Sequence, residues 1–183
     1  MKTILFAIPG NETLAHTLSE KLGAEMGKAI IRHFPDGESY VRILSDLTSQ
    51  KVVLICTLDR PDAKLLPLYF LSKIAKNSGA RCTCLLSPYL AYMRQDKIFQ
   101  PGEGVTSKYF AQILSGFADS LITVDPHLHR TSSLNKLYSI PTKVVHASIH
   151  ISIIVHLNNF SCLTVSTLNK FITIEKRNEN SYR

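Results

Sequence analysis

Apolar residues in the first 145 positions occur in short runs that polar and turn-forming residues separate. These runs predict strands at residues 2–8, 51–57, 81–86 and 120–124. Within the run at 51–57, residues 52–56 are continuously apolar, which is typical of a strand covered on both faces. Helix start and stop signals predict helices at residues 11–22, 61–77 and 106–117, with Asn11 as an N-cap and Pro61 in a first turn.

Residues 28–34 and 39–44 have strand character, and Asp36-Gly37 between them is a turn signal, so the pair predicts a β-hairpin. Strands and helices then alternate along most of the remaining chain. Strands that are connected through helices pair in parallel by right-handed crossovers. We therefore expect an α/β domain: a mostly parallel sheet flanked by helices, with a β-hairpin.

The composition of the chain changes abruptly near Val145. All 8 glycines and all 8 prolines precede this residue. Residues 146–183 contain neither, and they show no clean helical or strand period. We expect one domain over residues 1–145 and an atypical tail over residues 146–183, the latter frameshifted or otherwise unselected.

The chain has 183 residues, of which 45% are hydrophobic and 19% charged, and its net charge is +7. This composition is typical of a globular protein and excludes a disordered or collagen-like chain. No apolar run approaches the ~20 residues that span a bilayer, so no membrane partner is expected. Basic residues never form a block longer than two, which favours phosphorylated small molecules over nucleic acid as binding partners.

Two features of the sequence bear on the compartment. The N-terminal apolar run ends at Pro9-Gly10, too early for the h-region of a signal peptide. The four cysteines, Cys56, Cys82, Cys84 and Cys162, include no Cys-x-x-Cys pair, so a zinc site is not favoured. We expect reduced, buried thiols in a cytoplasmic protein.

Three polar clusters follow predicted strands, and ligands of parallel sheets collect beyond the carboxyl ends of the strands. The first cluster is Phe34-Pro35-Asp36-Gly37-Glu38. Its carboxylates can accept hydrogen bonds from a base amino group or a ribose hydroxyl, and its ring can stack on a base. The alternative is a plain hairpin turn, in which Asp-Gly needs no function.

The second cluster, residues 87–97, opens a predicted loop over residues 88–104. Arg94 and Lys97 provide donors suited to a polyphosphate, and Tyr92 could pack against a ligand. Loops longer than ~12–15 residues are usually functional or disordered. The alternative is a solvated charged loop.

The third cluster is Asp125-Pro126-His127-Leu128-His129-Arg130. An imidazole or the Asp125 carboxylate could bind a divalent cation. Two histidines are too few for a structural zinc site. The alternative is a turn at the end of a strand, with histidines that hydrogen-bond locally.

Taken together, the segments 34–43, 87–97 and 123–127 resemble those of the ribose-phosphate diphosphokinase family, also called phosphoribosyl-diphosphate synthetase. The motifs Arg94-Gln95-Asp96 and Asp125-Pro126-His127 are the more specific ones. The resemblance runs from Met1 to about Val145 and covers the amino-terminal domain of the family, which is phosphoribosyltransferase-like. It implies a Mg²⁺-dependent transferase of nucleotide biosynthesis that moves the β,γ-diphosphoryl group of ATP to the 1-hydroxyl of ribose 5-phosphate, giving phosphoribosyl diphosphate and AMP.

The resemblance also implies roles for individual residues. Contacts to the adenine and ribose of ATP would come from the hairpin loop, which in the family serves the site of a neighbouring subunit, so a homo-oligomer is implied. Arg94 and Gln95 would contact ATP, with Arg94 on the phosphates. His127 would bind Mg²⁺, with Asp125 nearby. The implied ATP-binding residues are Phe34, Asp36, Gly37, Glu38, Arg94 and Gln95.

The family has a second domain of similar size, which carries an acidic loop for ribose 5-phosphate, a catalytic lysine and a second metal-binding aspartate. Residues 146–183 contain no aspartate, so the acidic loop is not there and no catalytic residue is identified. We expect this chain to be inactive alone, as a fragment of the family enzyme. The alternative is a non-catalytic module that associates with full-length subunits and regulates them.

Overall fold

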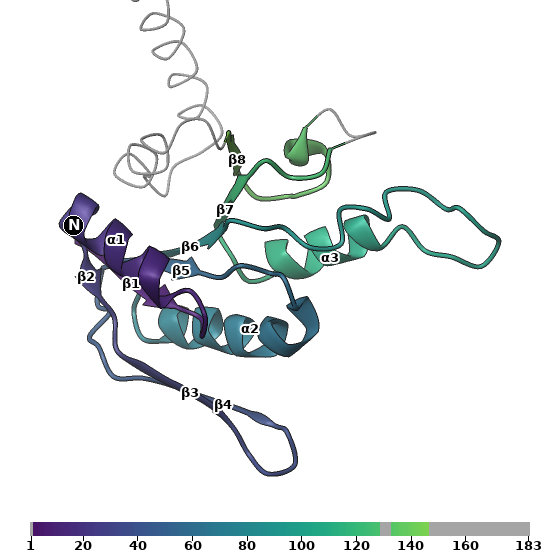
Figure 1. The fold of residues 1–183 in the computed structure, drawn as a ribbon. Helices are drawn as coiled ribbons and strands as arrows, with labels where there is room; N and C mark the ends of the chain where they lie inside the picture. Colours follow the sequence, from purple (N-terminus) through teal and green to yellow (C-terminus); the bar gives the residue numbers. More distant parts are fainter. Residues whose placement is uncertain (1, 129–132, 147–183) are drawn as a thin grey trace, which may run out of the picture.

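A six-stranded parallel sheet forms the centre of the domain (Figure 1). The computed structural model describes residues 2–128 and 133–146. The strands lie in the order β2-β1-β5-β6-β7-β8. Their bounds are β1 Thr3–Ala7, β2 Glu25–Met26, β5 Lys51–Ile55, β6 Cys82–Ser87, β7 Ser120–Val124 and β8 Thr142–Val145.

Helices cover both faces of the sheet. Leu18 of α1 (Glu12–Leu22) packs in a cluster with Leu5 and Ile55, whereas Leu71 of α2 (Pro61–Asn77) belongs to the cluster on the other face. The third helix, α3 (Thr106–Ser115), lies on the same face as α2. Successive strand residues point to opposite faces, which is why the continuously apolar strands are buried on both sides. A short 3₁₀ helix, η1 (Leu134–Lys136), precedes β8.

The strands β3 (Ala29–His33) and β4 (Ser39–Ile43) form a separate antiparallel hairpin. Its inner face packs on the α2 side of the core through Ile31, Val41 and Ile43. Figure 1 shows the hairpin passing along α2 and ending in a loop that projects from the domain.

The predicted fold class is confirmed: a mostly parallel sheet flanked by helices, with a β-hairpin. Two strands were not predicted. β2 is only two residues long, so no periodicity could reveal it. β8 is four residues long and lies against the boundary at which the composition changes. The expected tail lies outside the described residues, apart from His146, so the expected division of the chain stays a prediction.

The three cysteines that the structure describes are buried, as expected. Cys56 and Cys84 are free and buried, and burial raises the pKa of each thiol to about 12. Cys82 is buried as well. Cys162 lies outside the described residues. Within the described part of the chain, no helix has the length and apolar character needed to cross a membrane.

Candidate functional site

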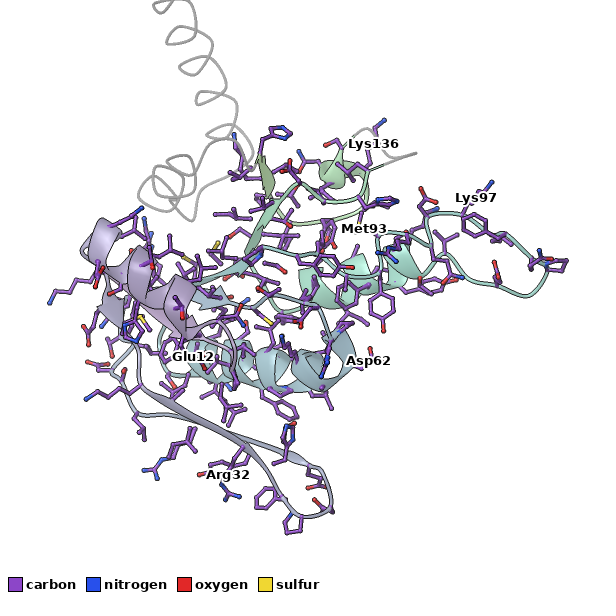
Figure 2. All side chains as sticks on the ribbon, viewed as in Figure 1. Glu12, Arg32, Asp62, Met93, Lys97 and Lys136 are labelled. Carbon is purple, nitrogen blue, oxygen red and sulfur yellow. The ribbon has the colours of Figure 1, made fainter. Side chains whose placement is uncertain are left out.

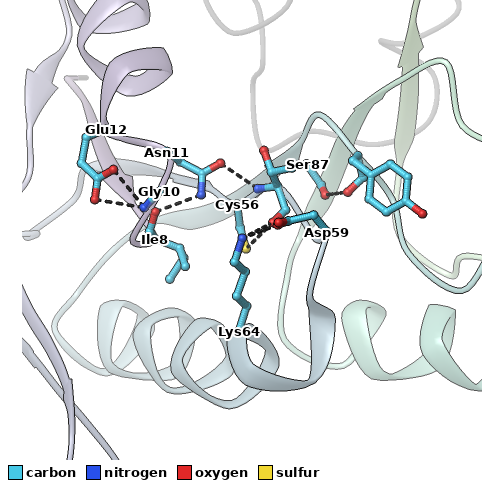
Figure 3. Close-up of polar contacts among 10 residues, drawn as sticks. Ile8, Gly10, Asn11, Glu12, Cys56, Asp59, Lys64 and Ser87 are labelled. Carbon is cyan, nitrogen blue, oxygen red and sulfur yellow. Dashed lines mark hydrogen bonds and ion pairs between the residues drawn. The ribbon is translucent and has the colours of Figure 1, made fainter.

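A network of polar contacts ties the loop after β1 to the loop after β5 (Figure 3). Asn11 is buried, and its Nδ2 donates to the Ile8 carbonyl at 2.9 Å. Its Oδ1 accepts from the Thr57 N–H at 2.8 Å. Asn11 does occupy the N-cap position of α1, but its side chain makes no capping hydrogen bond, so the predicted cap was wrong in its chemistry. The amide is used between two loops instead.

The other polar groups of the loops after β1 and β5 also form hydrogen bonds and an ion pair with one another. The Lys64 ammonium donates to the Thr57 carbonyl at 2.9 Å and pairs with Asp59, which holds the pKa of that carboxyl below its usual value. The Glu12 carboxylate accepts from the Gly10 N–H at 2.9 Å. α1 and α2 leave β1 and β5 toward opposite faces, an arrangement that often marks a ligand crevice. Here the polar groups are bonded to one another, so we take the loops after β6 and β7 as the candidate ligand loops.

The loop between β6 and α3 starts with an anchored segment. Leu90, Ala91 and Met93 are buried. Tyr92 has a left-handed φ of 60°, and its ring centroid lies 4.8 Å from that of Phe110. Its hydroxyl donates to the Asp62 carboxylate, which raises the pKa of the tyrosine. Tyr92 thus fixes the loop against α2 and α3.

Arg94 and Gln95 follow this anchor and differ in their surroundings. Arg94 is exposed, and it has no hydrogen bond or ion pair within the described residues. The Gln95 carbonyl accepts from the Ser107 N–H at 3.3 Å, and its Oε1 accepts from the Thr106 hydroxyl at 3.0 Å. Gln95 therefore holds the loop on the first turn of α3 and keeps Arg94 at the edge of the domain. Figure 2 shows Met93 against the body of the domain and Lys97 on the part of the loop that extends away from it.

Asp125 and His127 follow β7, the strand next to β6, and both are exposed. Asp125 has a left-handed φ of 37°, and its Oδ1 lies 2.8 Å from His146 Nδ1. His146 comes directly after β8, so its place beside Asp125 could be found only by predicting that strand. His129 and Arg130 lie outside the described residues.

The residues after β7 offer few ligands for a divalent cation. No cluster of three or more His, Cys, Asp or Glu side chains that could hold a metal occurs in residues 2–128 and 133–146. Mg²⁺ in phosphoryl-transfer sites usually has few protein ligands and completes its shell with water and substrate phosphates. Asp125 and His127 fit a cation of that kind, which is shared with a bound polyphosphate, and do not fit a protein-only site.

The hairpin loop is a tight, hydrogen-bonded turn. The Phe34 N–H donates to the Glu38 carbonyl at 2.8 Å, and the Gly37 N–H donates to the Phe34 carbonyl at 2.9 Å. Gly37 has a φ of 90°, a conformation that glycine adopts without strain. The Glu38 N–H donates to Asp36 Oδ1 at 3.1 Å. All five residues of the loop are exposed, so its ring and carboxylates are open to a ligand.

The structure brings two of the three predicted clusters to one edge of the sheet. Arg94 and Gln95 follow β6, and Asp125 and His127 follow the adjacent β7. The hairpin loop and the loop after β6 project from different parts of the domain (Figure 1). In the described part of the chain, no hydrogen bond, ion pair or ring contact joins residues 34–38 to the other two clusters.

Comparison with known proteins gives a consistent result. Residues 3–117 match a sequence model of a family described as the N-terminal domain of ribose phosphate pyrophosphokinase. The ribose-phosphate pyrophosphokinase of Saccharolobus solfataricus is 35% identical over 127 residues, which cover 67% of this chain and 44% of that protein. The protein of the same name from Methanopyrus kandleri is 35% identical over 145 residues, covering 79% of this chain and 49% of that protein.

The fold has a counterpart among solved structures. The phosphoribosylpyrophosphate synthetase of Mycobacterium smegmatis superposes with a TM-score of 0.74 at 20% identity, over 86% of this chain and 52% of that one. At this identity the likeness concerns the fold alone. This chain spans about half the length, or less, of the curated relatives that it matches.

Proposed function

The chain belongs to the ribose-phosphate pyrophosphokinase family, as its amino-terminal domain, and we propose that it forms the ATP-binding half of that enzyme's site. One observation carries the proposal. Gln95 holds the loop on α3 and so places Arg94 at the same sheet edge as Asp125 and His127, and the exposed Arg94 guanidinium has no hydrogen bond or ion pair among the described residues. A guanidinium at the same sheet edge as a carboxylate and an imidazole suits a polyphosphate with its cation.

The proposed roles follow the chemistry of each group. Arg94 binds the phosphates and Gln95 keeps it in place. His127, with Asp125 nearby, holds Mg²⁺, which neutralises phosphate charge when bound. Phe34, Asp36, Gly37 and Glu38 contact the adenine and ribose of an ATP molecule that is bound to a neighbouring copy, because their loop lies apart from the other clusters. The functional assembly is then a homo-oligomer, and we expect it to work in the cytoplasm.

The complete enzyme would transfer the β,γ-diphosphoryl group of ATP to the 1-hydroxyl of ribose 5-phosphate and release AMP. Such transfer depends mostly on positioning and charge neutralisation, which Arg94 can provide for the nucleotide. We propose that residues 1–145 carry this nucleotide half only. Residues 146–183 contain no aspartate with which to bind the sugar phosphate.

We expect the purified chain to bind ATP but to form no AMP when it is incubated with ATP, Mg²⁺ and ribose 5-phosphate. Binding is measured by calorimetry and AMP by chromatography, with a full-length relative as positive control. AMP above the no-enzyme background would show that the chain is complete in itself. No ATP binding at any Mg²⁺ concentration would contradict the proposed half-site.

The alternative role, a module that associates with full-length subunits, has some support on the surface of α2 and α3. Leu66 is 57% exposed and Tyr109 is 55% exposed, and Phe70 and Ile113 on the same helices are exposed as well. Exposed groups of large apolar side chains commonly mark contact surfaces. Co-purification of the chain with a full-length relative, together with a change in the relative's activity, would favour this role.

Replacement of His127 by alanine should weaken the Mg²⁺ dependence of ATP binding, because one protein ligand of the shared cation is lost. The measurement is an ATP titration at several Mg²⁺ concentrations. His16→Ala is the control, since His16 is an exposed histidine on α1. Identical Mg²⁺ profiles for the two variants would instead assign His127 to a simple turn.

A further inference from the structure

Arg32 lies against two aromatic rings on the β3–β4 hairpin. Its guanidinium carbon is 4.7 Å from the ring centroid of Phe34 and 4.4 Å from that of Tyr40. The two rings meet edge to face, with centroids 5.8 Å apart and an interplanar angle of 85°. The three side chains therefore form one stacked group, which we call the Arg32 stack.

The pairing of the hairpin explains why the Arg32 stack forms. Arg32 pairs with Tyr40 across the hairpin, and Ile31 pairs with Val41. Ile31 and Val41 pack against the core, so Arg32 and Tyr40 point away from it. Figure 2 shows Arg32 on the side of the hairpin that faces away from α2.

The contacts of Arg32 are those of a residue that holds a ring in place. Within the described residues its side chain makes no hydrogen bond or ion pair, so the contacts of the guanidinium with the two rings are its specific interactions. Phe34 is 39% exposed, and without the stack its ring would be free to rotate at the tip of a projecting hairpin. A planar guanidinium can stack on a ring, whereas an ammonium cannot cover it in the same way.

We propose that Arg32 is a positioning residue that holds the Phe34 ring ready to stack on a nucleotide base, with Tyr40 as its support. The inference rests on the proposed binding of ATP and adds two residues to it. The Asp36 and Glu38 carboxylates beside the ring can then accept from the edge of the base and from the ribose, because the ring fixes where the base lies. Arg32 acts on the base and not on the phosphates.

The test compares Arg32→Lys with the unaltered chain by calorimetry, using ATP and inorganic triphosphate as ligands at the highest chain concentration that stays soluble. ATP affinity should fall about two- to fivefold, because the free energy of an exposed cation–π contact corresponds to a change of this size in the dissociation constant. Affinity for triphosphate should not change. Arg42→Lys is the matched control, because Arg42 lies opposite Ile30 and has no ring contact in the described part of the chain. In a Phe34→Leu background, Arg32→Lys should have no additional effect.

Each other outcome contradicts the inference in a different way. An equal loss for ATP and triphosphate would mean that Arg32 acts through its charge or through folding. Unchanged ATP affinity in Arg32→Lys, with ATP bound by the unaltered chain, would overturn the role of Arg32 and leave the proposed function standing. Absence of ATP binding by the unaltered chain would overturn the proposed function first, and with it this inference.

Discussion

Replacing Arg94 by alanine is expected to weaken ATP binding about 10- to 150-fold, which corresponds to ~1.5–3 kcal/mol for a hydrogen bond to a charged group. Arg94 has no partner among the described residues, so the substitution removes a ligand contact and leaves no buried group unsatisfied. Calorimetric titration with ATP and Mg²⁺ measures the change.

Two further variants separate the role of Arg94 from general electrostatics. Lys136→Ala removes a positive charge from the exposed end of η1 and should change ATP affinity only slightly. Arg94→Lys should recover part of the affinity, because the charge returns without the bidentate geometry. Thermal unfolding should be nearly the same for all three variants. An ATP affinity that is unaffected by Arg94→Ala would place the phosphates elsewhere.

Replacing Asn11 by alanine is expected to lower the free energy of unfolding by ~1–3 kcal/mol, because the partly buried Thr57 N–H loses its partner. The Ile8 carbonyl loses the bond from the Asn11 side chain but keeps the one from the Asn11 backbone N–H, at 3.1 Å. Urea unfolding, followed by circular dichroism, measures the change.

The matched control for this prediction is Asn77→Ala at the exposed end of α2, where a change within ~0.5 kcal/mol is expected. Asn11→Asp keeps an acceptor for Thr57 but places a carboxylate oxygen against the Ile8 carbonyl, so it should also destabilise the domain. A loss as small as that of the control would mean that water replaces the Asn11 amide at little cost.

The sequence was informative where burial or turn chemistry alone determines local structure. The continuous apolar run of β5 predicted a strand covered on both faces because no polar residue interrupts it. Asp36-Gly37 predicted the hairpin because the turn needs a residue that tolerates φ of 90°, as Gly37 shows. The start of α2 at Pro61 was predicted for a similar reason, since proline fits a first helical turn.

Features that depend on distant partners could not be predicted in this way. Asn11 looked like a helix cap, because nothing near it in the sequence reveals Thr57 as its partner, 46 residues away. The approach of His146 to Asp125 depends on the pairing of β8 with β7. Gln95 was expected only to contact ATP, and its contacts with the first turn of α3 appear once the loop is folded. The Arg32 stack likewise needs the register of the hairpin.

The distance between the hairpin loop and the edge formed by β6 and β7 affects how the protein would respond to dilution (Figure 1). If the base and the phosphates of one ATP molecule are bound by different copies of the chain, tight binding requires that those copies associate. The apparent affinity for ATP then rises with protein concentration, by mass action. The linkage is reciprocal, so the nucleotide also strengthens self-association. A bound ATP molecule would then link two copies of the chain.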